Sequence, residues 1–191
     1  MWKESKMTWT VLGPVKTADA AGLRESVLKG QYKGLTSKEA HCANLYFRTR
    51  PDTGYLGMFP SARGGQTVWT VTTIKAKKAG KQKFMVGFDA PARSNRRWTG
   101  VPKNGTWSQT GARIWINGKE VTNPRTYRLA GKHAHPGNAW NFESPLDPEE
   151  IWWVQEPVEL ELKAGENRVV IEAPYVGEHH SWGVSFIPVK N

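Results

Sequence analysis

The chain has 191 residues, of which 38% are hydrophobic and 23% charged, and its net charge is +10 at pH 7. This is the composition of a globular protein, and no run approaches the roughly 18 apolar residues that a membrane helix needs. We expect one domain over residues 1–191, because a chain of this length can bury one substantial core. The single cysteine, Cys42, excludes an internal disulfide framework, and we expect it to be a small buried residue.

The N-terminal region predicts one strand and one short helix. Residues 1–7 show no apolar signal-peptide core, so either the natural protein is intracellular or this sequence is a piece whose leader lies elsewhere. Residues 8–12 are predicted to form a strand that ends at Gly13-Pro14. A short helix follows, with Asp19 as its expected cap and Gly30 as its stop.

The middle of the chain predicts further strands. They cover residues 43–49, a weaker candidate at 55–59, and then 67–76 and 83–88. A lysine-rich run at residues 75–83 lies where the last two strands meet. We interpret it as a solvated hairpin tip, because lysines on turns and edges also keep strands from pairing with other molecules.

The second half predicts two hairpins and a long excursion. Asn117-Gly118 supplies the positive φ angles of a type I′ turn between two short strands. Regular patterning lapses between residues 123 and 157, apart from one predicted helical turn at Pro148. Residues 158–162 and 169–173 alternate apolar and polar side chains around a turn, and a last strand follows at 182–189. We therefore predict an all-β, two-layer antiparallel sandwich with long loops and at most short helices.

Catalytic motifs are not recognisable in the sequence. A glycosidase needs two carboxylates across a cleft and a metal site needs clustered ligands, and neither stands out. His133 with His135, and His179 with His180, are interpreted as solvent-exposed loop residues. We expect no enzyme activity, no cofactor and no metal, and a structural calcium ion stays open without a supporting motif.

The loops are rich in tryptophan, arginine and asparagine. An indole stacks on the apolar face of a sugar, while guanidinium and amide groups bond its hydroxyls. The alternative is that each loop tryptophan fastens its loop to the sandwich. The loop tryptophans are Trp98, Trp107, Trp140, Trp152 and Trp153, whereas Trp9, Trp69, Trp115 and Trp182 fall within strands and are expected in the core or on a sheet face.

One long connection between two predicted strands carries the candidate ligand-binding residues: Arg93, Asn95, Arg96, Trp98 and Trp107. A loop anchored at both ends holds an indole and a guanidinium together without a large ordering penalty on binding. In the competing interpretation the arginines and Asn95 fasten the loop by bonding backbone carbonyls.

Several ordered segments carry a resemblance to a known family. They are residues 87–97, 100–107 and 114–118, followed by 143–146, 157–158, 162–167, 173–175 and 182–189. Together they resemble the galactose-binding-like β-sandwich that lies C-terminal to the catalytic barrel in family 20 glycoside hydrolases of gut Bacteroidetes. The paired catalytic Asp-Glu motif of the barrel has no counterpart in this chain.

The resemblance implies a jelly-roll-like sandwich with a non-catalytic, accessory role in degrading N-acetylhexosamine-containing glycans. It implies a glycan or the catalytic domain of a parent enzyme as partner, and a periplasmic or extracellular location. Three alternatives follow in falling order: a purely structural domain, a nucleic-acid-binding domain suggested by the +10 charge, and a stand-alone enzyme. We expect no nucleic-acid partner, because no nucleic-acid-binding motif is present.

Overall fold

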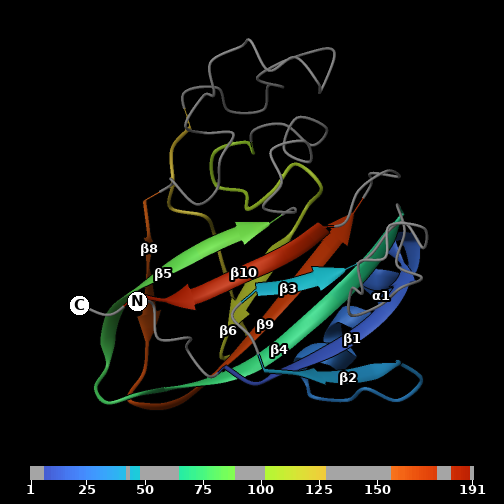
Figure 1. Ribbon diagram of the computed structural model, residues 1–191, viewed down its shortest axis with the longest axis horizontal. Coiled ribbons are helices and arrows are strands. Elements are labelled where there is room, and N and C mark those ends of the chain that lie inside the picture. The colour runs from blue at the N-terminus through green and yellow to red at the C-terminus, as the bar shows by residue number, and fades with distance from the viewer. Residues whose placement is uncertain are drawn as a thin grey trace.

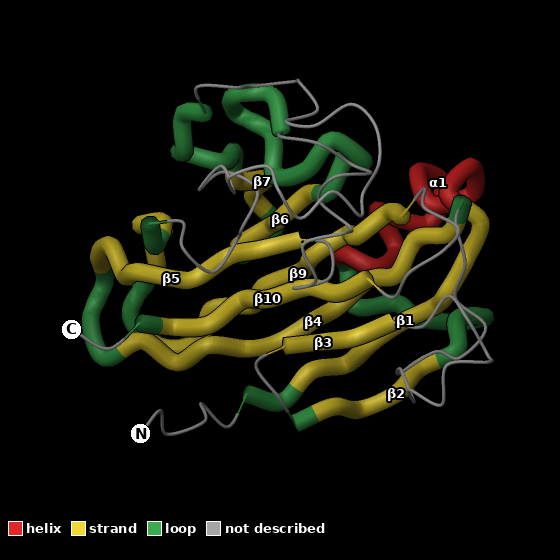
Figure 2. The backbone as a smooth tube through the Cα atoms, turned by 45° about the horizontal axis from the view of Figure 1, so that its top comes forward, coloured by secondary structure: helices red, strands yellow, loops and turns green. Residues whose placement is uncertain are grey.

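Two antiparallel β-sheets pack face to face, and one helix lies on the outer face of the larger sheet (Figure 1, Figure 2). The computed structural model describes residues 7–41, 44–47, 65–88, 102–127, 156–175 and 182–189. Every strand pairing among them is antiparallel. The predicted all-β sandwich is therefore confirmed.

Each sheet mixes strands from distant parts of the chain. The larger sheet has the order β2 (Ser37–Ala40), β1 (Trp9–Lys16), β4 (Gln66–Ala76), β9 (Gly165–Tyr175), β6 (Arg113–Ile116) and β7 (Lys119–Val121). The smaller sheet has the order β3 (Asn44–Phe47), β10 (Trp182–Pro188), β5 (Gly80–Phe88) and β8 (Val158–Leu162).

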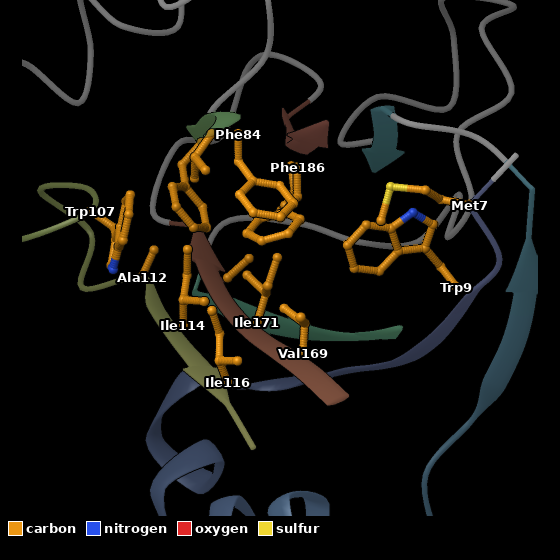
Figure 3. Close-up of a cluster of buried hydrophobic side chains, with 14 of the residues drawn as sticks. Met7, Trp9, Phe84, Trp107, Ala112, Ile114, Ile116, Val169, Ile171 and Phe186 are labelled. Carbon is orange, nitrogen blue, oxygen red and sulfur yellow. The ribbon is translucent and has the colours of Figure 1, made fainter. Parts of the chain in front are cut away.

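Alternate residues of the strands fill the space between the sheets. In β8, Val158, Leu160 and Leu162 are buried while the two glutamates between them are exposed. Phe186 stacks at 4.7 Å on Phe84 of the same sheet and meets the edge of Trp9, from the facing sheet, at 6.3 Å. Figure 3 shows this cluster extending from Trp9 at one end to Trp107 at the other. Each such side chain stabilises the fold by about 1.5–3 kcal/mol when fully buried.

Helix α1 (Thr17–Leu28) covers the outer face of the larger sheet and makes a second apolar cluster. Its C-terminus ends as predicted at Gly30, which has φ +78° and donates to the carbonyl of Val27, while Gln31 donates to Ser26. Its start differs from the prediction, because Lys16 occupies the N-cap position without a side-chain hydrogen bond. Asp19 lies within the first turn, where a carboxylate favours the positive end of the helix dipole.

The first strand does not end at Gly13-Pro14. β1 runs on to Lys16, and its register against β4 shifts between Leu12 and Val15. A bulge of this kind admits a proline within a strand because the ladder is already interrupted there. Gly13 has φ +111°, and a Cβ at this position would lie 3.1 Å from the Thr67 carbonyl oxygen.

Two predicted hairpins prove to be arches that connect the two sheets. β4 lies between β1 and β9 in the larger sheet, whereas β5 lies between β10 and β8 in the smaller one. Likewise β8 and β9 belong to different sheets. The arches lie side by side, because β4 pairs with β9 and β5 pairs with β8. The lysine-rich run is thus part of an arch and not a hairpin tip.

Other predictions have mixed outcomes. The Asn117-Gly118 turn is confirmed, with φ angles of 52° and 82° between paired β6 and β7. Trp9, Trp69 and Trp115 are buried as expected. The predictions for Cys42, residues 55–59, His133, His135, Trp140, Pro148, Trp152, Trp153, His179 and His180 lie outside the described residues.

Candidate binding surfaces

The loop before β6 and the edge strand β7 enclose a surface hollow of about 410 Å³, here called the loop hollow. Its walls combine polar and apolar surface in similar amounts. They comprise Lys103, Gly105, Thr106, Trp107, Ser108, Gln109, Gly111, Ala112, Arg113, Glu120, Val121 and Thr122.

Trp107 forms part of the wall of the loop hollow but is itself almost fully buried. The Trp107 indole packs into the core, where its ring lies 6.4 Å from that of Phe88, and only 6% of the residue is exposed (Figure 3). Its Nε1 donates to the carbonyl of Val121 over 2.7 Å. The indole therefore fastens the loop to β7, and its faces are not open for stacking on a sugar.

Asn123 fixes the same loop from the other side. Its Nδ2 donates to the carbonyl of Thr106 over 2.9 Å and to Tyr127 Oη over 3.0 Å. Its backbone forms an isolated bridge with Gly105, and the Asn104 side chain accepts from the backbone N–H of Tyr127. The walls of the hollow are thus held in place before any ligand arrives, which reduces the ordering entropy of binding.

Exposed charged side chains and a mostly buried serine hydroxyl line the hollow. Arg113 Nη1 lies 3.8 Å from Glu120 Oε2, and both side chains are nearly half exposed. Ser108 Oγ lies 2.8 Å from Thr110 Oγ1 and accepts from the backbone N–H of Ala112. A set of cations, a carboxylate and hydroxyls can both donate to and accept from a polyhydroxylated ligand.

Four of the five sequence-predicted site residues, Arg93, Asn95, Arg96 and Trp98, lie outside the described residues. The fifth, Trp107, lines the loop hollow. Sequence reasoning did not single out Gln109, Glu120 and Thr122. The signal for them is weak, because isolated polar residues beside an edge strand have no distinctive pattern.

A second hollow of about 780 Å³ lies at the end of the sandwich where β4 crosses to β5, and we call it the arch-end groove. Its lining consists of residues 75–82, Leu162, Pro188 and Val189, and includes Lys75, Lys77, Lys78 and Lys81. An adjacent hollow of about 550 Å³ shares Lys75 and Pro188 with it and continues past Thr8, Thr10, Thr72 and Thr73.

Metal-ligating side chains do not gather in groups of three or more anywhere in the described part of the chain. The helix found there, α1, has 12 residues, and no described helix is long and apolar enough to cross a membrane. What the described residues offer is therefore two surface sites that differ in charge. The loop hollow has mixed charge, whereas the arch-end groove is lined by lysines without a carboxylate.

Comparison with models of known protein families gives no match for this chain. Comparison with curated protein sequences gives no match either.

Proposed function

We propose that this chain is a non-catalytic carbohydrate-binding module of a glycan-degrading enzyme, and that a sugar binds in the loop hollow. The main support is the hollow itself. Its volume of about 410 Å³ falls within the range of small-ligand sites, and its walls carry hydroxyl, amide and charged groups. Val121, which is only partly buried, supplies apolar surface for the C–H face of a sugar.

The resemblance to the accessory sandwich of family 20 glycoside hydrolases supports the same proposal. The described part of one resembling segment, residues 102–107, lies in the loop before β6, and another segment, residues 114–118, lies in the β6–β7 hairpin. On this proposal the strands follow a jelly-roll-like order, the parent enzyme is periplasmic or extracellular, and N-acetylhexosamine-containing glycans are the ligands. Hydrolysis then belongs to a catalytic domain outside this sequence.

A glycan array followed by calorimetry tests the proposal. The wild-type chain should bind at least one N-acetylhexosamine-containing glycan, and Thr122→Val should weaken that binding roughly fivefold, because one hydrogen bond contributes about 1 kcal/mol. Thr36→Val is the matched control, since Thr36 is exposed and does not line the hollow.

Two results would overturn the proposal. One is that no glycan binds the wild-type chain, which leaves a structural domain that packs on its catalytic domain. The other is that Thr36→Val weakens binding as much as Thr122→Val. A separate assay with an aryl N-acetylglucosaminide should show no turnover by the pure chain, and turnover that one of its own carboxylates controls would contradict the non-catalytic assignment.

A further inference from the structure

The arch-end groove concentrates positive charge at one end of the sandwich. Lys75 is the second-last residue of β4, Lys77 and Lys78 lie in the three-residue connection, and Lys81 is the second residue of β5. All four are exposed, and no aspartate or glutamate is among the residues that line the groove.

Two of these lysines have carboxylates beside them on neighbouring strands. Lys75 lies opposite Glu166 in the β4–β9 register, and Lys81 lies opposite Glu161 in the β5–β8 register. Lys81 Nζ is also 3.8 Å from Glu159 Oε2, with both side chains more than half exposed. An ion pair so exposed is weak and is screened by salt.

Lys77 and Lys78 differ from these two. They lie in the arch, outside both ladders, and within the described ranges neither has an ion pair or a hydrogen bond through its side chain. They carry charge that no neighbouring strand neutralises. A negatively charged ligand would therefore gain the most electrostatic attraction by contacting these two lysines.

Lysines often protect the open edge of a sheet against pairing with another chain. β4 and β5 are inner strands, but β1 pairs with β4 only from Gln66 to Thr72, and β10 pairs with β5 only from Phe84 to Phe88. One edge of each strand is therefore open beside the arch, where Lys75 and Lys81 can protect it. Lys77 and Lys78 lie outside both strands, so edge protection does not explain these two lysines.

We propose that the arch-end groove binds an anionic polysaccharide, with the lysines contacting its sulfate or carboxylate groups. The adjacent hollow adds hydroxyls, of which Thr73 and Thr8 are exposed, for the uncharged parts of the sugar rings. No aromatic side chain lines either hollow, whereas sites for single-stranded nucleic acid use aromatic rings to stack bases. This site is separate from the loop hollow, so the result of testing it does not depend on whether the proposed function is correct.

The experiment measures binding of the full chain to heparin and to chemically desulfated heparin by calorimetry at several salt concentrations. The double variant Lys77→Ala/Lys78→Ala should bind heparin on the order of tenfold more weakly near 0.15 M salt. The slope of log affinity against log salt should also fall by about two, because two fewer anionic groups are neutralised. Desulfated heparin should bind the wild-type chain much more weakly than heparin.

The matched control is Lys33→Ala/Lys119→Ala, which removes the same charge from exposed positions outside the groove. It should keep heparin affinity within about twofold of wild type. An equal loss in this control would overturn the site, because it would show a response to net charge alone. Tighter binding of a DNA oligonucleotide than of heparin at the same salt would overturn the choice of ligand, and failure of heparin to bind would overturn the proposal as a whole.

Discussion

Arg24 on helix α1 and Glu172 in the middle of β9 form a two-point ion pair that holds the helix against the larger sheet. Arg24 Nε donates to Glu172 Oε2 over 2.7 Å, and Nη2 donates to Oε1 over 3.0 Å. The Glu172 side chain is only 6% exposed and also accepts a 3.4 Å bond from Trp69 Nε1. The hydrogen bond to Glu172 raises the pKa of Arg24, and burial of the guanidinium partly opposes this rise.

Removing one member of this pair should destabilise the fold. Arg24→Met leaves the Glu172 carboxylate buried without its cation, and we expect the free energy of unfolding to fall by about 2–4 kcal/mol, since the Arg24 side chain is partly exposed. Arg24→Met/Glu172→Leu should be more stable than the single variant, because no unpaired charge remains. Urea unfolding measures both, and a change below about 0.5 kcal/mol for Arg24→Met would contradict this reasoning.

The exposed ion pair between Glu25 and Lys29, at the C-terminal end of α1, predicts that the stability of the fold falls as the pH falls. Lys29 Nζ donates to Glu25 Oε1 over 2.6 Å, and this hydrogen bond, followed by the charge of Lys29, lowers the pKa of Glu25. The stabilisation that ionised Glu25 provides is therefore present at pH values above the ordinary glutamate pKa. It is lost as the pH falls through the lowered pKa of Glu25. NMR titration should show the Glu25 pKa returning to its ordinary value in Lys29→Gln, and identical titrations in both proteins would contradict the pair.

Two glycines of helix α1 and its C-terminus should respond in opposite directions to alanine. Gly22 lies inside the helix and a Cβ there meets no atom within 4 Å, so Gly22→Ala should stabilise the fold by about 1 kcal/mol. Gly30 also has free space but adopts φ +78°, so Gly30→Ala should destabilise it by about 1 kcal/mol. Thermal unfolding compares the two directly, and shifts of the same sign would be evidence against the helix end described here.

Trp107 should behave as a structural residue. Trp107→Phe keeps an aromatic ring in the core but removes the donor to the Val121 carbonyl, and we expect a loss of about 1–3 kcal/mol. Trp107→Ala should lose more, about 3–5 kcal/mol, because a cavity forms beside Phe88. Urea unfolding measures both variants. If Trp107→Ala keeps the stability of the wild type but abolishes glycan binding, the indole contacts ligand directly.

Local signals in the sequence correctly predicted two of the turns and most of the described strands, although β2 was not predicted and β1 extends past its predicted end. The alternation of Val158, Leu160 and Leu162 with glutamates determines which side of β8 is buried. Asn117-Gly118 and Gly30 mark turns because the backbone there needs positive φ. These properties depend on neighbouring residues only, and are therefore accessible without tertiary structure.

The candidate site was less accessible to sequence reasoning. Trp107 was identified as a loop tryptophan near strands, and both interpretations of it were left open. Its burial against Phe88 and its bond to Val121 decide in favour of fastening the loop. Thr122 and Glu120 join the loop hollow only because the β6–β7 hairpin carries them beside a loop that precedes it in the chain.

Strand pairing was decided by the tertiary structure alone. The alternation in residues 158–162 and 169–173 is the same whether the second strand lies beside the first or faces it across the core, because in both cases one side of each strand is buried. The choice of an arch depends on which strands compete for each edge. β9 pairs with β4 and β6, whereas β8 pairs with β5, and these partners come from distant parts of the chain. Local periodicity thus determined the secondary structure of this protein, and the long-range competition among strands determined where its lysines and polar loops gather.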